Sequence, residues 1–146
     1  MASRITLLKN QLSGSKKLET VVIKDSSPPI GPFVPAKKVK AGANLVYVSG
    51  QVGIDSKTNE LPDCVVEQAR NAMASVEKIL KASNSSFENV FKAIVYLTDM
   101  GNFAKVNEEY ARWFKSGNYP ARVCFAVQGL PRGAKVEIEV IAVEDN

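Results

Sequence analysis

The 146-residue sequence predicts one α+β domain, in which two helices pack on one face of a single mixed β-sheet. Three observations predict this class. Six short segments are rich in β-branched and apolar residues, and two longer segments repeat apolar residues at helical spacing. Clusters of glycine, proline, serine and asparagine separate these segments. The predicted order is β-β-β-α-β-α-β-β, with no internal repeat.

Three strands open the predicted domain. Residues 20–24 are β-branched and stop at a proline-rich segment, residues 28–32, where Gly31 permits an unusual backbone angle. Residues 35–40 are a predicted edge strand, and residues 45–49 are the clearest early strand.

Two segments are predicted to be helices. The chain leaves the sheet at Gly50, and Asp63 is the predicted N-cap of a first helix that ends near Ala82. Its apolar positions recur every three or four residues, at Val66, Ala69, Met73, Val76 and Leu80. After an inner strand at residues 91–97, Asp99 caps a second helix. The apolar positions of that helix are Phe103, Val106, Tyr110, Trp113 and Phe114.

Two strands separated by a turn with glycine and proline end the domain, and they cover residues 121–128 and 135–144. Alternation along the first places Arg122 and Cys124 on one face. On the last strand both faces are apolar around Glu137 and Glu139, so at least one glutamate lies near buried surface.

A sheet with helices on one face leaves the other face open. If that face is apolar, a second subunit must cover it.

Composition limits the chemistry available to this chain. There is no histidine, which excludes His-based triads, and Cys64 and Cys124 cannot complete a zinc or iron site alone. Two cysteines suit a reducing compartment. The net charge of +4 is scattered without interleaved aromatic residues, so no nucleic-acid partner is expected. No apolar stretch is long enough to span a membrane, so no membrane partner is expected either.

The N-terminal segment is basic and contains serine but no acidic residue over residues 1–18. This composition resembles a weak organelle transit segment, and the favoured alternative is a polar extension on a cytoplasmic protein. We therefore predict an extension at residues 1–19 and a single domain at residues 20–146, located in the cytoplasm with the mitochondrion as alternative.

Arg122 and Asn107 are polar residues at apolar positions. The residues alone favour, by a small margin, an internal salt bridge from Arg122 to Glu137 or Glu139, but the planar fork of Arg122 also matches an incoming carboxylate. Asn107 lies on the apolar side of its helix, where its amide either braces a loop or lines a pocket. Ser49 and Gln51 are either turn formers or pocket donors.

Seven ordered motifs resemble the RidA family, the 2-iminobutanoate/2-iminopropanoate deaminases formerly called L-PSP endoribonucleases or translation inhibitors. The resemblance covers about residues 20–144. The motifs are I-G-P-F (30–33), V-S-G-Q (48–51), V-Y-L-T-D-M (95–100), F-A-K-V-N (103–107), P-A-R-V-C (120–124), L-P (130–131) and V-E-I-E-V-I-A-V (136–143). The resemblance implies a chorismate mutase-like fold and a homotrimer with ligand clefts between subunits.

The same resemblance implies which residues act on a small 2-imino acid. Arg122 holds the substrate carboxylate and Glu137 positions the attacking water, with no metal or cofactor. The implied substrate-binding residues are Phe33, Ser49, Gly50, Gln51, Asn107 and Cys124. The family commonly has tyrosine where this chain has Phe33, so a proton relay through that hydroxyl is not expected. The alternative functions are an endoribonuclease or translation inhibitor, and a non-catalytic trimer that binds small carboxylates.

Overall fold

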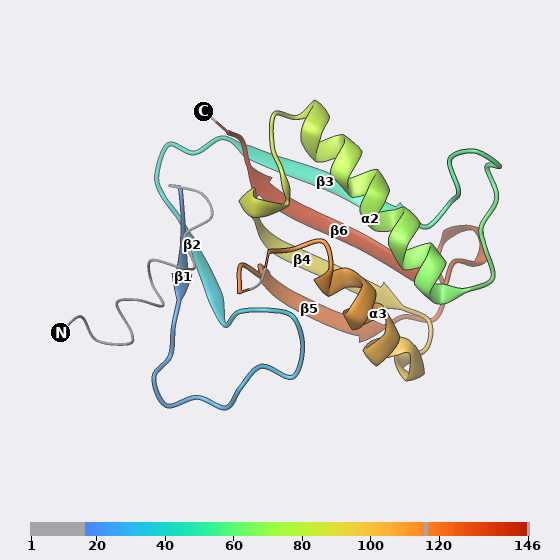
Figure 1. Cartoon of the computed structure of the whole chain (residues 1–146), viewed down its shortest axis with the longest axis horizontal. Helices are drawn as coiled ribbons and strands as arrows, with labels where there is room; N and C mark the ends of the chain where they lie inside the picture. The colour runs from blue at the N-terminus through green and yellow to red at the C-terminus, as the bar shows by residue number, and fades with distance from the viewer. Residues whose placement is uncertain (1–16, 116, 146) are drawn as a thin grey trace.

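A computed structural model describes residues 17–115 and 117–145 of the chain, so residues 1–16 of the predicted extension lie outside the described part. It contains a four-stranded mixed sheet with the strand order β3-β6-β4-β5 (Figure 1). Strands β4 and β5 are parallel, and the other neighbours are antiparallel. The strands are β3 (Leu45–Val52), β4 (Val90–Leu97), β5 (Ala121–Ala126) and β6 (Val136–Val143).

Both long helices cover the same face of this sheet, α2 (Val65–Ala82) and α3 (Phe103–Ala111) (Figure 1). Their apolar stripes meet the inward-facing residues of β4 and β6 and form one core. Met73, Leu80 and Tyr110 are among its fully buried side chains. The α+β class and the placement of both helices on one face are confirmed.

The first two strands differ from the expectation of a single sheet. β1 (Leu18–Val21) and β2 (Ala36–Val39) pair only with each other and form a two-stranded sheet beside the main one (Figure 1). Two bonds hold this hairpin near the start of β5: Val34 N–H donates to Pro120 O at 3.1 Å, and Lys37 Nζ to Asn118 Oδ1 at 3.0 Å. Alternation along a short strand does not specify its partner, so the sequence could not place the hairpin.

Several predicted boundaries move. Cys64 and not Asp63 occupies the N-cap of α2, without a side-chain bond. Asp99 does not cap α3 itself, whose N-cap is Asn102. Its carboxylate accepts from Gly101 N at 2.8 Å and caps the short 3-10 helix Met100–Asn102, which leads into α3. The predicted exit from the sheet at Gly50 is wrong, because β3 continues to Val52 through an irregularity between Val48 and Gln51.

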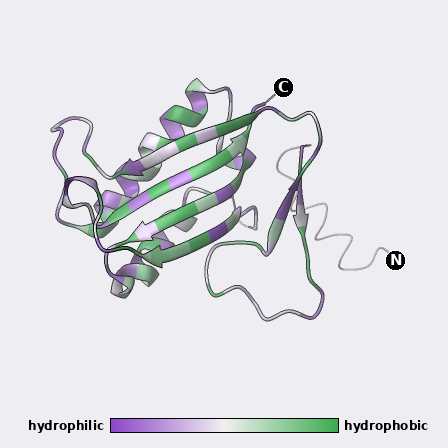
Figure 2. Cartoon of the chain, turned by 180° about the vertical axis from the view of Figure 1, so that it is seen from behind, coloured by the Kyte–Doolittle hydropathy of each residue, from purple (hydrophilic) through white to green (hydrophobic). Residues whose placement is uncertain are grey.

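The face of the sheet opposite the helices carries apolar side chains. Figure 2 shows this face with no helix in front of it. The large apolar residues exposed on its strands are Leu45, Tyr47, Val123 and Phe125. Within the described residues, no helix is long and apolar enough to cross a membrane. The open face of the sheet therefore leaves these apolar side chains uncovered in the single chain.

Candidate active site

Arg122 projects from β5 toward the helices. It is paired in register with Ala93 of β4, a fully buried residue of the helix-facing side. Its Nη1 donates to Oδ1 of Asn107 on α3 at 2.7 Å. None of the carboxylates among residues 17–115 and 117–145 forms a salt bridge with it. Most N–H groups of this guanidinium are therefore left for another acceptor.

Three aromatic rings surround the guanidinium. Its Cζ lies 4.9 Å from the ring centre of Tyr110, 5.8 Å from Phe33 and 5.9 Å from Phe103. The faces of such rings attract a cation, which compensates part of the cost of burying it. Burial nevertheless lowers the pKa of Arg122 from its usual value, while Tyr110 and Cys124 oppose this change. A guanidinium stays charged under all ordinary conditions, so the site is a partly buried cation with no carboxylate counter-ion among the described residues.

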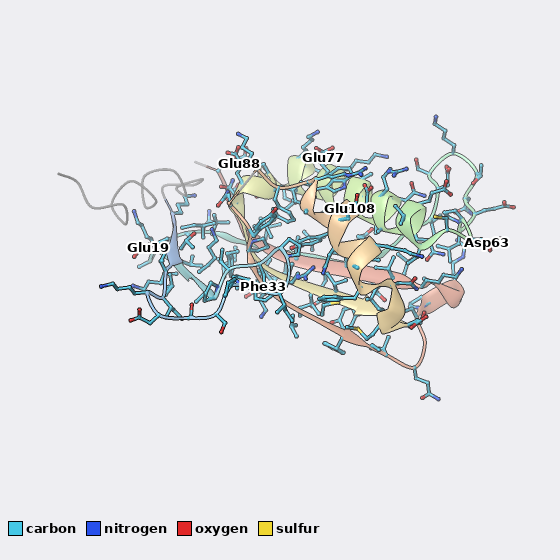
Figure 3. The ribbon with its side chains drawn as sticks, turned by 60° about the horizontal axis from the view of Figure 1, so that its bottom comes forward. Glu19, Phe33, Asp63, Glu77, Glu88 and Glu108 are labelled. Atoms are coloured by element: carbon cyan, nitrogen blue, oxygen red, sulfur yellow. The ribbon has the colours of Figure 1, made fainter. Side chains whose placement is uncertain are left out.

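The loop of residues 30–33 covers this cation. A Cβ atom added to Gly31 would lie 2.9 Å from Nη2 of Arg122 and 3.3 Å from Nδ2 of Asn107. Gly31 does not use the unusual backbone angle that a glycine permits, because it is not among the glycines with positive φ. Glycine is needed here for close approach. Figure 3 shows Phe33, from the same loop, where the hairpin meets the body of the domain.

Cys124 lies two residues beyond Arg122 on the same face of β5. Burial raises the pKa of its thiol, and the positive charge of Arg122 opposes that effect. A thiol kept protonated is a poor nucleophile. The structure therefore gives Cys124 a place beside the cation but no activation.

Glu137 lies on the open face of the sheet. On β6 its neighbours Val136 and Ile138 are fully buried against the helices, so the side chain of Glu137 points the other way. It is paired with Tyr96 of β4 and folds over Gly50 of β3, where an added Cβ would collide with Oε1 of Glu137. Gly50 thus makes room for the carboxylate.

Ser49 and Gln51 flank Gly50 at the irregularity of β3. Ser49 is exposed, and Gln51 Nε2 donates to the backbone oxygen of Ser49 at 3.0 Å. Seven of the eight predicted site residues therefore form two groups on opposite sides of the sheet. One group is Phe33, Asn107, Arg122 and Cys124, and the other is Ser49, Gly50 and Glu137. Gln51 is paired in register with Ile138, a buried residue of the helix-facing side, so it does not share the face of Glu137.

The separation of these groups excludes one interpretation of Arg122. A salt bridge to Glu137 or Glu139 within the chain is wrong, since both carboxylates lie on the face that Arg122 does not share. Sequence reasoning also missed Phe103 and Tyr110 as neighbours of the cation. Their spacing of four and three residues from Asn107 was the available signal, because such residues share one helix face.

Comparison with known proteins gives the same motifs a family. The model of the family described as "Endoribonuclease L-PSP" matches residues 24–144. The chain belongs to this family. It is the family called RidA above, and a mouse member named 2-iminobutanoate/2-iminopropanoate deaminase is 46% identical over 116 residues, 79% of this chain and 83% of its own.

Other members of the L-PSP family extend the comparison. The human protein of the same name is 40% identical over 116 residues, 79% of this chain and 82% of its own. Among solved structures, E. coli TdcF with bound serine has a TM-score of 0.67 at 35% identity, covering 87% of this chain and 99% of TdcF. Yeast Mmf1 has a TM-score of 0.66 at 38% identity, covering 88% of this chain and 99% of its own.

Proposed function

We propose that this L-PSP family member hydrolyses small 2-imino acids to 2-keto acids and ammonia. The observation that carries the proposal is the guanidinium of Arg122, partly buried among aromatic rings and without a carboxylate partner in the described chain. Such a group suits a small acid, because two parallel N–H groups match a carboxylate. The mouse and human relatives named as deaminases and the bound serine of TdcF, itself a small amino acid, support this ligand class.

The proposed chemistry requires orientation and one proton acceptor. Arg122 holds the carboxylate of a protonated imine, with Asn107 fixing the guanidinium. Glu137 accepts a proton as water adds to C2, which forms a tetrahedral carbinolamine. Glu137 returns this proton to nitrogen, the C–N bond breaks, and nitrogen leaves with the electron pair. The hydroxyl proton moves to solvent or to the departing ammonia, leaving the 2-keto acid and ammonium.

In this proposal the two groups meet between subunits. Arg122 and Glu137 lie on opposite faces of one sheet, so one chain cannot place both beside one substrate. The apolar side chains on the open face would pack on neighbouring copies, and we propose a homotrimer in which each cleft takes Arg122 from one subunit and Glu137 from the next. Ser49 and Gly50 then line the cleft beside Glu137.

Turnover of an imino acid tests the proposal. An imine of 2-aminobutanoate is generated in situ by an amino-acid oxidase, and 2-oxobutanoate formation is followed beyond the uncatalysed rate. Arg122→Ala should abolish the enzymatic rate with the fold retained, and Glu137→Gln should lower kcat more than it raises the dissociation constant of 2-oxobutanoate. Full activity of Arg122→Ala would refute the anchor. Binding of 2-oxobutanoate without turnover by the unmodified protein would favour a non-catalytic carboxylate-binding trimer.

Mixing subunits tests where the cleft lies. If each site takes Arg122 and Glu137 from different chains, co-refolded Arg122→Ala and Glu137→Gln subunits should regain about one quarter of the intact sites at equal mixing. Each variant refolded alone is the control. Recovery of no activity in the mixture would refute a cleft shared in this way.

A ribonuclease is the second candidate, because the matching family model carries that description. Cleavage of RNA that co-purifies with the deaminase activity, and is lost in Arg122→Ala, would favour it.

We also propose residues 20–146 as the catalytic unit and the cytoplasm as its compartment, with the mitochondrion as alternative. Fluorescent fusions with and without residues 1–19 would test the compartment, and the turnover assay on residues 20–146 would test the catalytic unit.

A further inference from the structure

Gly31 lies against the donor atoms assigned above to the substrate acid. A methyl group at this position would lie 2.9 Å from Nη2 of Arg122 and 3.3 Å from Nδ2 of Asn107. It would also lie 3.6 Å from Cε1 of Phe33, an ordinary contact. Since the φ of Gly31 is not positive, the close approach to the Arg122 and Asn107 side chains explains the glycine, and conformational freedom does not.

The guanidinium is held from several sides. The ring of Tyr110 lies 4.9 Å from Cζ, the amide of Asn107 accepts from Nη1, and the backbone of Gly31 approaches Nη2. Nη2 is the end of a flexible side chain, so an added methyl group can push it away without moving the backbone. The displaced group would then be the guanidinium, and the rest of the fold would stay in place.

We infer that Gly31 is a positioning residue. Because it has no side chain, its backbone lies directly against the guanidinium of Arg122 and fixes the plane of that group. The inference rests on the proposed function, because it concerns how Arg122 presents its donors to a carboxylate. Two parallel N–H···O bonds require both donors in the plane of the acid. A rotation of the guanidinium that leaves its charge in place therefore weakens the binding of a planar carboxylate more than the binding of a point-charge anion such as chloride.

Gly31→Ala is the test, with Gly129→Ala as the matched control. Gly129 is also a loop glycine without positive φ, and nothing lies within 4 Å of its added Cβ. The dissociation constant of 2-oxobutanoate is measured by calorimetry on the full chain, together with the thermal unfolding midpoint. Gly31→Ala should raise the dissociation constant of 2-oxobutanoate about tenfold, since a small misplacement of a binding group lowers its effect by this factor or more. The thermal unfolding midpoint should not change. Gly129→Ala should change neither quantity.

The same substitution in an Arg122→Ala background decides between positioning and a general loop effect. Without the guanidinium, Gly31→Ala should add no further loss of affinity. An undiminished loss in that background, or unchanged affinity of Gly31→Ala alone, would overturn the inference. If Arg122→Ala itself binds 2-oxobutanoate normally, the proposed function fails, and the two failures are thereby distinguished.

A second variant covers the case in which Gly31→Ala does not fold. Arg122→Lys removes Nη2, the atom that the new methyl group would meet. The double variant with Gly31→Ala should then fold with the stability of Arg122→Lys alone. Unfolding of that double variant would overturn the inference, because the clash would lie elsewhere.

Discussion

The guanidinium of Arg122 has rings and an amide as partners where a buried cation ordinarily has a carboxylate. Three ring faces within about 6 Å offset part of its desolvation, and Asn107 satisfies one N–H. The rest of the desolvation cost is not offset within the described chain. In the proposed function, a bound carboxylate would offset it, so the site would gain affinity for an acid at the expense of the stability of the empty protein.

Tyr110 gives a first prediction at the residue scale. Its hydroxyl is fully buried and is the one side-chain polar group in the described chain that is buried without a hydrogen-bond partner. Burial also raises the pKa of Tyr110 far above its usual value. Tyr110→Phe removes the unsatisfied group and keeps the ring, so the free energy of unfolding should rise by about 1 kcal/mol.

Urea unfolding measures this change. Tyr119→Phe is the control, because Tyr119 is only partly buried and water can reach its hydroxyl. That variant should stay within about 0.5 kcal/mol of the unmodified protein. A loss of stability in Tyr110→Phe would mean that the hydroxyl has a partner, such as a bound water.

Cys124 gives a second prediction, on pH. Because burial raises the pKa of its thiol, the thiolate fraction at neutral pH is smaller than for a free thiol. In a Cys64→Ser background, alkylation of Cys124 by iodoacetamide should become fast only above about pH 8.5, the ordinary thiol pKa. Arg122→Ala should move this profile to still higher pH, since the guanidinium stabilises the thiolate. Fast alkylation at neutral pH would contradict the assignment of Cys124 as a protonated thiol that is not activated as a nucleophile.

At the scale of elements, the contact between β3 and α2 depends on Gly53. A Cβ at this position would collide with the backbone of Gln68 in the first turns of α2. Gln68 is itself fixed at both ends, since its Nε2 donates to Pro62 O at 2.6 Å and its Oε1 accepts from Lys135 N at 2.8 Å. A shift of Gln68 away from Gly53 would strain these two bonds, and a shift of Gly53 would strain the bond that its carbonyl oxygen accepts from Asn71 Nδ2 at 3.2 Å.

Gly53→Ala should therefore destabilise the fold by about 2 kcal/mol or more, as overpacking against a backbone does. The thermal midpoint reports this change, and Gly129→Ala again serves as the control for exchanging glycine for alanine in open space. An unchanged midpoint would show that α2 can shift along the sheet.

The elements also show what the sequence could predict. Periodicity predicted α2 and β4 well, because many buried positions in a row repeat the same signal. It could not place the hairpin of β1 and β2, since four-residue strands contain too little pattern to choose a partner. The exit at Gly50 was wrong for a related reason: a glycine at a strand irregularity looks like one that ends a strand.

For the site, composition and alternation predicted which residues are exceptional but not how they meet. Alternation placed Arg122 and Cys124 on one face, which the structure confirms. It could not relate that face to the face of Glu137, because the strand order is a long-range property. The aromatic surroundings of Arg122 come from a loop and a helix, and their convergence needs the folded chain.

At the scale of the whole molecule, the open face predicts assembly. Phe125 is 42% exposed there and packs edge-on against Tyr96, with ring centres 5.4 Å apart. A charge at this position would have to be buried on association, so Phe125→Glu should shift the protein toward monomer and lower its activity. Light scattering after size-exclusion chromatography measures the shift. The control is Lys78→Glu, on the exposed side of α2, which should leave the assembly intact. If Phe125→Glu were still a trimer, the subunits would have to meet through a different surface.

The opposite orientation of Arg122 and Glu137 has a kinetic consequence. If no single chain holds a complete active site, the turnover rate per milligram of protein depends on the protein concentration. Below the concentration at which subunits separate, the specific rate should fall with every further dilution, and a preincubated dilute sample should show a lag on reconcentration. An assay run at nanomolar protein could then report an inactive protein where the cell, at higher abundance, has an active one.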